Sequence, residues 1–510
     1  MTSAAVGGGG PAKTGPQLIA YADRFGGTIA RLAALLRGPF AGAFTGVHVL
    51  PFYSPFDGSD AGFDPRDHTE VDQRLGTWSD VRDLARSHEV MADLIVNHMS
   101  ADAAQFRDFV ANGDVSPWRE MFLTMTSVFP AGATEADLAA IYRPRPGLPF
   151  TAMTVGGARR LVWTTFTAQQ VDLDIRSTKT WDYLTGIVDR LTGAGVGLIR
   201  LDAVGYVAKA AGTSCFMTSA ALDFIRRLRQ YARERGARVL VEIHAPYHQQ
   251  IEAASVADYV YDFALPPLVL YALLSKQCEP LVSWLAMRPA NVVTVLDTHD
   301  GIGVIDAGPM GEQPGLLNAG QLDALVEGIH ANSGGASKIA TGTAASNLDL
   351  YQVNCTFYDA LGSDDDAYLL ARLIQLFLPG TPQVYYVGLL AGKNDVDLLR
   401  RTGTGRDINR HHYSLDEIRG ELSRRVVRDQ LSALRFRAAH PAFGGEFSYH
   451  ADHSRLELRW RHGAHTASLV VDVEAMGFLL LATGPHATMG RVRRDNFSDL
   501  DALTARADPR

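Results

Sequence analysis

The sequence predicts an α/β fold, a (β/α)8 TIM barrel with two inserted loop domains and a C-terminal antiparallel β domain. Three observations support this prediction. Short β-branched runs alternate with amphipathic helical patterns, as in parallel β-α units. Eight such runs can be counted, which is the number a closed barrel needs. From about residue 443 the pattern changes to strict alternation of apolar and polar residues, which is typical of antiparallel strands.

The eight predicted strands lie at 18–21, 47–50, 90–96, 198–201, 239–242, 259–263, 292–296 and 384–387. Helical patterns between them predict helices at 28–36, 79–87, 181–191, 220–235 and 364–377. We expect Ser79 and Ser363 to act as N-caps of the second and last of these helices.

Two connections are too long for ordinary loops, and both follow the end of a predicted strand. We therefore predict a disordered extension at 1–16, a catalytic barrel at 17–95, 178–301 and 363–442, an inserted domain B at 96–177, an inserted domain B′ at 302–362 and a β domain at 443–510. Because both insertions leave carboxyl ends of strands, we expect them to cover the face where barrel enzymes hold their active sites.

Composition excludes several classes of partner. The 510 residues carry 48 Lys and Arg against 56 Asp and Glu, a net charge of −8, with no basic stripe for nucleic acid or an anionic membrane. Cys215, Cys278 and Cys355 are far apart and show no disulfide framework or zinc spacing. The most apolar segment, 373–392, is interrupted by prolines and polar residues, and the N-terminus lacks a signal-peptide pattern. These features predict a cytoplasmic protein.

Three acidic residues stand at or just beyond the carboxyl ends of predicted strands: Asp202, Glu242 and Asp300. One such acid alone is usually a helix cap or a solvated loop residue, but three together indicate catalysis. Arg200 precedes Asp202 by two positions, so both side chains point the same way and the guanidinium should keep the carboxylate ionised. An ionised Asp202 beside a protonated Glu242 suits retaining glycoside chemistry, with Asp300 stabilising the oxocarbenium-like transition state.

Four segments resemble the signature regions of the α-amylase clan of glycoside enzymes: Asp-Leu-Ile-Val-Asn-His (93–98), Arg-Leu-Asp-Ala-Val (200–204), Val-Glu-Ile-His (241–244) and Leu-Asp-Thr-His-Asp (296–300). Further segments resemble the sucrose phosphorylase subgroup, across nearly the whole chain from Gln17. They are Asp-Gly-Ser-Asp-Ala-Gly-Phe-Asp (57–64), Tyr-Arg-Pro-Arg-Pro-Gly-Leu-Pro-Phe (142–150), Ala-Gly-Thr-Ser-Cys-Phe-Met-Thr (211–218), Ser-Asn-Leu-Asp-Leu-Tyr-Gln (346–352) and Gly-Arg-Asp-Ile-Asn-Arg (405–410).

The resemblance implies a reaction in which sucrose and inorganic phosphate are converted reversibly to α-glucose 1-phosphate and fructose. It implies Asp202 as nucleophile, Glu242 as acid and base, and Asp300 as transition-state stabiliser. Residues implied to hold the glucosyl hydroxyls are Asp60, His98, Arg200, His299 and Arg406, with Phe63 and Tyr206 as an aromatic wall. Residues implied for the acceptor side are Arg145, His244, Asp349, Tyr351 and Gln352. Arg145 is the candidate for binding the phosphate anion.

The resemblance implies no cofactor and no metal, and it leaves open whether the chain forms a homodimer, since relatives occur as dimers and monomers. The glycine run at 193–197 precedes a strand instead of following one, so it does not predict a nucleotide site. Taken singly, His98 and His299 could bond only to backbone, Phe63 and Tyr206 could be packing residues, and Arg145 could be a solvated loop charge.

The sequence leaves alternatives open. The stretch His-Ala-Pro-Tyr-His (244–248) departs from the closest subgroup pattern, so sucrose 6′-phosphate, glucosylglycerol or glucosylglycerate could be the donor instead. The same covalent intermediate could be intercepted by water or by a sugar, giving a hydrolase or a transglucosylase. A non-catalytic sugar-binding barrel is the alternative from another class, and retention of all three acids argues against it.

Overall fold

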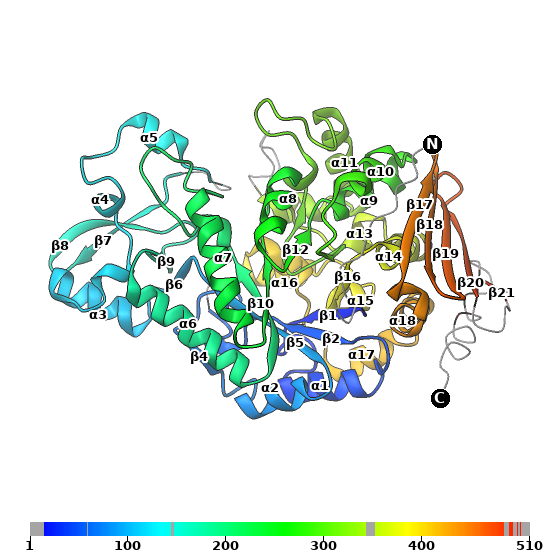
Figure 1. Cartoon of the computed structure of the whole chain (residues 1–510), viewed down its shortest axis with the longest axis horizontal. Coiled ribbons are helices and arrows are strands. Elements are labelled where there is room, and N and C mark those ends of the chain that lie inside the picture. The colour runs from blue at the N-terminus through cyan, green and yellow to red at the C-terminus, as the bar shows by residue number, and fades with distance from the viewer. Residues whose placement is uncertain are drawn as a thin grey trace.

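The computed structural model describes residues 15–58, 60–143, 147–342, 352–483 and 489–492, together with Phe497 and Leu500. Eight parallel strands close into a barrel in the order β1, β2, β5, β10, β11, β12, β13 and β16 (Figure 1). Their bounds are Gln17–Ala20, Gly46–Val49, Glu89–Ile95, Val196–Asp202, Arg238–Val241, Tyr259–Asp262, Val292–Thr294 and Thr381–Tyr385. The predicted barrel is therefore confirmed.

The barrel strands are almost wholly buried, because helices cover the outside and side chains fill the inside. Because both faces of each strand are buried, the strands appear in the sequence as short apolar runs. The last strand begins three residues earlier than predicted, since β16 includes Pro382, a residue that is rare inside strands. Residues Tyr386–Leu389 form helix α15 instead of continuing that strand.

The predicted helices are present, and they surround the barrel with others that the pattern did not reveal. The predicted set is α1 (Ile29–Arg37), α2 (Trp78–Ala85), α6 (Thr178–Gly193), α7 (Ser219–Arg233) and α14 (Asp365–Phe377). Other helices around the barrel include α8 (Tyr247–Val256), α9 (Leu265–Ser275), α10 (Glu279–Met287), α16 (Val396–Thr402), α17 (Leu415–Glu421) and α18 (Arg425–Ala439).

Both predicted N-caps are wrong by one or two residues. Thr77 caps α2, because its hydroxyl and the Asp80 carboxylate form a reciprocal capping box. Asp364 caps α14 by accepting bonds from two backbone N–H groups, whereas Ser363 lies just before it in the left-handed region at φ 55°.

A lobe between β5 and α6 projects from the barrel, at the left of Figure 1. It contains β6 (His98–Ser100), α3 (Ala104–Asn112), α4 (Met125–Val128), α5 (Glu135–Ala140), β7 (Phe150–Val155), β8 (Ala158–Trp163) and β9 (Gln170–Asp172). Pairing of β6 with β9 joins its start to its end, with His98 opposite Asp172. The lobe thus brings residues about 70 positions apart to the mouth of the barrel.

A second long segment follows β13. It contains β14 (Ile302–Gly303), the short helix η4 (Ile305–Ala307), α11 (Ala319–Asn332), α12 (Ala336–Thr341), β15 (Gln352–Val353) and α13 (Phe357–Ala360). Strands β14 and β15 pair antiparallel, with Ile302 opposite Val353. A further short pair, β3 (Tyr53–Ser54) and β4 (Asp67–Val71), follows β2.

The C-terminal part is an antiparallel sheet of five strands, as the alternating pattern predicts. The strands are β17 (Glu446–Ala451), β18 (Arg455–His462), β19 (His465–Asp472), β20 (Gly477–Thr483) and β21 (Met489–Val492). Leu456, Leu458 and Trp460 are buried, and the indole N–H of Trp460 donates to the Phe377 carbonyl oxygen at 2.7 Å, which ties the sheet to α14.

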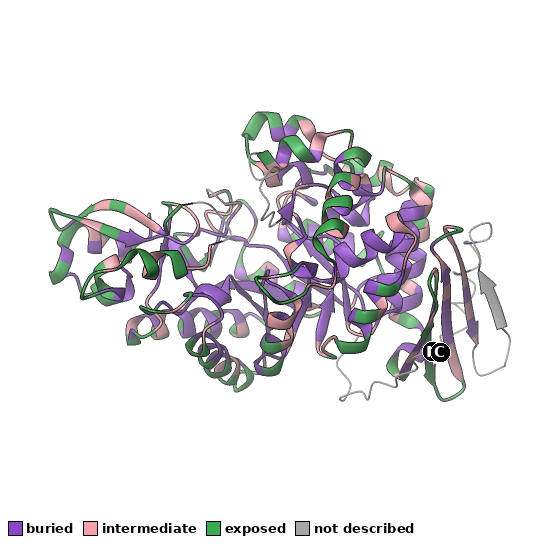
Figure 2. Cartoon of the chain, turned by 90° about the horizontal axis from the view of Figure 1, so that it is seen from above, coloured by how far each residue is buried: buried purple, intermediate pink, exposed green. Residues whose placement is uncertain are grey.

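Figure 2 shows that buried residues concentrate in the barrel and the inner faces of its helices, while the outer edges of the lobe are exposed. In the part of the chain that the structure describes, no helix is both long enough and apolar enough to cross a membrane.

Candidate active site

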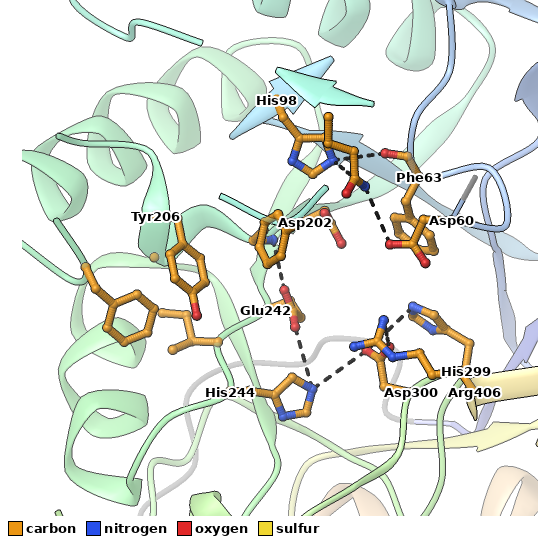
Figure 3. Close-up of a pocket in the computed structure, with 16 residues that line it drawn as sticks. Asp60, Phe63, His98, Asp202, Tyr206, Glu242, His244, His299, Asp300 and Arg406 are labelled. Atoms are coloured by element: carbon orange, nitrogen blue, oxygen red, sulfur yellow. Dashed lines mark hydrogen bonds and ion pairs between the residues drawn. The ribbon is translucent and has the colours of Figure 1, made fainter. Parts of the chain in front are cut away.

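A pocket opens at the carboxyl ends of the barrel strands and encloses about 740 Å³ of space, part of it open to solvent. Ten of the residues singled out in the sequence line it: Asp60, Phe63, His98, Asp202, Tyr206, Glu242, His244, His299, Asp300 and Arg406 (Figure 3). They come from six separate stretches of the chain, so the fold brings the predicted residues to one place.

The three acids meet because the strand ends are in register. Leu201 of β10 lies opposite Val241 of β11, which places Asp202 and Glu242 side by side at the next position. Asp300 enters from the loop after β13, and all three residues are less than 10% exposed. Ala203 adopts a left-handed conformation at φ 51°, and its N–H donates to Glu242 Oε2 at 2.9 Å.

Arg200 lies beneath the pocket and is shared among several carboxylates. Its Nη1 contacts Asp93 and lies 3.0 Å from Asp202 Oδ1, while its Nη2 is 3.9 Å from Glu242 Oε2. The predicted contact between Arg200 and Asp202 is therefore present.

The charge of Asp202 depends on more than that contact. Burial raises the pKa of Asp202, Arg200 lowers it, and the neighbouring Glu242 raises it again, so that the net pKa is well above the usual value. The expectation that Arg200 alone keeps Asp202 ionised is thus incomplete. The Arg200 guanidinium lies closer to Asp202 than to Glu242, and this contact favours the negative charge on Asp202.

Asp93 supports Arg200 from the barrel interior and accepts a second contact from His48 Nε2 at 2.9 Å. Although burial raises the pKa of Asp93, His48 and Arg200 lower it more, to about 2. Its stabilising contribution is therefore fully present above pH 4 and is lost as the pH falls toward 2.

We expect Asp93→Asn to lower the free energy of unfolding at pH 7 by about 2 kcal/mol or more. The difference from wild type should shrink as the pH falls from 4 to 2, because the unfolded chain binds a proton at Asp93 below pH 4 while the folded protein does so only near pH 2. Urea unfolding over this pH range measures it, with Asp397→Asn on the exposed surface of α16 as control. A difference that stays constant over that range would contradict this account.

Asp300 is held as an anion. Arg406 Nη1, from η6 (Gly405–Asn409), lies 2.8 Å from Asp300 Oδ1, and His299 Nε2 and His244 Nε2 lie 3.7 and 3.8 Å from Oδ2. Burial raises the pKa of Asp300, but these cationic and hydrogen-bonding neighbours lower it well below its usual range. A fixed negative charge therefore faces the pocket.

One side of the pocket is suited to sugar hydroxyls. His98 Nε2 lies 3.0 Å from the Phe63 carbonyl oxygen and 3.1 Å from Gln170 Nε2, and the Gln170 amide donates to Asp60 Oδ2 at 3.5 Å. The Phe63 ring stacks on His299 at 4.9 Å with an angle of 9°. Burial lowers the pKa of His299 to about 3, so this ring is neutral and can both donate and accept hydrogen bonds.

The opposite wall is aromatic. Tyr206 packs against Phe216 at 4.6 Å and Phe166 at 5.3 Å. Gly205 must lack a side chain here, since a Cβ would lie 2.6 Å from the Phe216 ring. Phe166, Gln170 and Phe216 were not predicted, because they lie in loops or in the short strand β9, where no local pattern marks them.

The predicted acceptor residues are described only in part. His244 lines the pocket, and Gln352 reaches its edge through a 3.4 Å hydrogen bond from Arg406 Nη2. Arg145, Asp349 and Tyr351 lie outside the described residues.

One group among the described residues has the composition and spacing of a possible metal site. Ligand atoms of Glu242, His244 and Asp300 all lie within 4.8 Å of one another. However, His244 Nδ1 lies 3.0 Å from Asp306 Oδ2, and although burial lowers the pKa of His244, Asp306 and Asp300 raise it to about 10. A protonated imidazole has no lone pair for a metal, so these residues fit an ion-paired cluster better than a cation site.

The chain was compared with known proteins. Residues 42–252 match the family model described as alpha amylase, catalytic domain. The chain is 55% identical over 463 residues to a sucrose phosphorylase of Bifidobacterium adolescentis, covering 89% of this chain and 92% of the relative. It is 54% identical to a sucrose phosphorylase of Agrobacterium vitis, covering 92% of this chain and 98% of the relative.

Among solved structures, sucrose 6F-phosphate phosphorylase from Thermoanaerobacter thermosaccharolyticum superposes with a TM-score of 0.87 at 34% identity. That likeness covers 94% of this chain and 98% of the other. Identity above 50% across nearly the full length, together with the shared barrel, shows that this chain belongs to the sucrose phosphorylase family of α-amylase-type enzymes.

Proposed function

We propose that this chain is a retaining glycoside phosphorylase that converts sucrose and phosphate reversibly to α-D-glucose 1-phosphate and D-fructose. The observation that carries the proposal is the meeting of Asp202, Glu242 and Asp300 in one pocket with the predicted glucosyl contacts around them. The choice of sucrose is supported by the 54–55% identity to the two sucrose phosphorylases.

In the first half of the reaction, the Asp202 carboxylate attacks the anomeric carbon of the glucosyl unit. Glu242 gives its proton to the departing fructosyl oxygen, and a β-glucosyl ester forms on Asp202. Asp300 stabilises the positive charge that develops on the sugar ring, while the neutral His299 and His98 hold hydroxyl groups.

In the second half, phosphate takes the place of fructose. Glu242, now ionised, accepts the proton of the phosphate as a phosphate oxygen attacks the anomeric carbon, and the Asp202 carboxylate leaves. Two inversions give net retention, so the product is the α-anomer.

We propose that His244 and Gln352 border the acceptor site, together with Arg145, Asp349 and Tyr351 from outside the described residues. Three free, buried cysteines support a reducing, cytoplasmic location. A homodimer remains a proposal from the family resemblance.

A panel of donors tests the substrate. The enzyme is incubated with phosphate and either sucrose, sucrose 6′-phosphate, glucosylglycerol or glucosylglycerate, and kcat/KM is obtained from the release of glucose 1-phosphate. We expect sucrose to be preferred by at least about tenfold, because a site shaped for one leaving group leaves polar groups unpaired with another. Preference for another donor would overturn the choice of substrate while leaving the double displacement intact.

A further inference from the structure

Asp306, which was not predicted from the sequence, lies just behind the pocket in η4 and is completely buried. Its Oδ2 lies 3.0 Å from His244 Nδ1, and its Oδ1 accepts hydrogen bonds from the Ala245 N–H and from Gln250 Nε2, both at 3.0 Å. Both carboxylate oxygens are therefore engaged by the segment that follows Glu242.

We propose that Asp306 is a positioning residue that holds His244 as an imidazolium between Glu242 and Asp300, and so maintains a cation where phosphate approaches. The role of Asp306 rests on the proposed function: Asp306 would adapt the acidic active-site pocket to an anionic acceptor.

The orientation of the His244 ring is fixed from three directions. Its face stacks on Phe263 at 3.9 Å with an angle of 12°, and its Nδ1 faces Asp306. Its Nε2 then lies 3.6 Å from Glu242 Oε1 and 3.8 Å from Asp300 Oδ2, as the dashed lines in Figure 3 show. Among the described residues, the carboxylates that face the ring nitrogens within 4 Å include Asp306 from η4, Glu242 after β11 and Asp300 after β13.

The backbone around this contact is shaped for it. Gly303 in β14 has no side chain, and a Cβ there would collide with the Asp306 carboxylate and lie 3.2 Å from His244 Nδ1. The start of the segment after β13 therefore packs directly against the Asp306–His244 pair. Only glycine at position 303 leaves that pair in place.

The pair matters because the pocket is otherwise strongly acidic. Asp202, Glu242 and Asp300 surround the place where a phosphate anion must reach the anomeric carbon. Arg200 lies beneath them against Asp93, and Arg406 pairs with Asp300. A charged His244 offsets part of the repulsion between these carboxylates and the incoming anion.

Asp306→Asn tests the role with little change of shape. The amide oxygen can still accept from Ala245 and Gln250, while the amide nitrogen can donate to His244 Nδ1. That arrangement favours the neutral ring protonated at Nε2, so the hydrogen bond is kept and the charge is lost.

The informative measurement is the ratio of glucose 1-phosphate to glucose, which reports how the glucosyl-enzyme partitions between phosphate and water. The rate of the first half-reaction affects both products equally and cancels in this ratio. At pH 7.5 we expect Asp306→Asn to need about 30-fold more phosphate for equal partition. The phosphate concentrations that the variant and the wild type need for equal partition should become similar at acid pH, because His244 of the variant then regains its proton. Gly303→Ala, which displaces the carboxylate, should change the partition in the same direction.

Asp262→Asn is the matched control, because Asp262 in β12 is equally buried but pairs with Arg288. It should lower stability without changing the partition. A second readout is the 13C signal of the His244 ring, assigned by its loss in His244→Gln among the 16 histidines. It should report a charged ring at pH 7.5 in the wild type and a neutral one in Asp306→Asn.

An unchanged partition, a pH-independent loss, or a His244 ring still charged in Asp306→Asn would overturn the inference. If the wild type released no glucose 1-phosphate, the proposed function would fail instead. The ring signal would still decide whether Asp306 sets the charge of His244.

Discussion

Asp202→Ala is expected to lower kcat for phosphorolysis of sucrose by at least about 10⁴-fold while the protein stays folded. Asp202 ends β10, and its Oδ1 lies 3.0 Å from Arg200 Nη1. Without Asp202 no covalent glucosyl ester can form. The pocket can then still bind the sugar, and Asp300 can still stabilise positive charge on the sugar ring, but the nucleophile is missing. Initial rates of glucose 1-phosphate release measure the loss, and circular dichroism checks the fold.

Azide makes this prediction stereochemically specific. In Asp202→Ala the space left by the carboxylate lies on the β face of the sugar, so azide entering there should yield β-glucosyl azide. Asp397→Ala, at an exposed position in α16, serves as the control and should keep full activity. Turnover near the wild-type level in Asp202→Ala would remove Asp202 from the mechanism.

Glu242→Gln is expected to lower the rate with sucrose by about 10²- to 10⁴-fold, because the fructosyl oxygen then leaves without a proton. α-Glucosyl fluoride needs no such proton, so its reaction with the enzyme to form the glucosyl ester should be affected far less. Rapid-mixing measurements of fluoride and fructose release compare the two donors.

The azide product separates the two acids. Glu242→Gln keeps the nucleophile, so azide should attack the glucosyl ester from the α face and give α-glucosyl azide, the opposite anomer to that from Asp202→Ala. Glu252→Gln in the adjacent helix α8 is the matched control. If both donors were slowed equally by Glu242→Gln, Glu242 would not be the acid.

The barrel and the three acids could be predicted because their signals are local. Strands buried on both faces produce β-branched runs, and an acid directly after such a run must lie at the carboxyl end of the barrel. Helix α9 has no such signal, because it is apolar on nearly every side and has two prolines in its first turn. Its burial comes from packing between layers, not from an amphipathic pattern.

The rest of the site depends on contacts between distant segments. Gln170 reaches His98 because β9 pairs with β6, and Phe216 reaches Tyr206 because Gly205 leaves room for its ring. Asp306 follows Asp300 by only six residues, yet its partner His244 lies 62 positions earlier in the chain. No local pattern marks such partners, because they come from segments far apart in the chain.

The central claim is a glucosyl group bound covalently to Asp202. Glu242→Gln incubated with α-glucosyl fluoride in the absence of phosphate should accumulate this ester, because the base for its breakdown is missing. Mass spectrometry of peptides from the acid-quenched protein should find one added anhydroglucose unit on Asp202. Attachment to another residue, or no adduct although fluoride is released in a burst, would contradict the account.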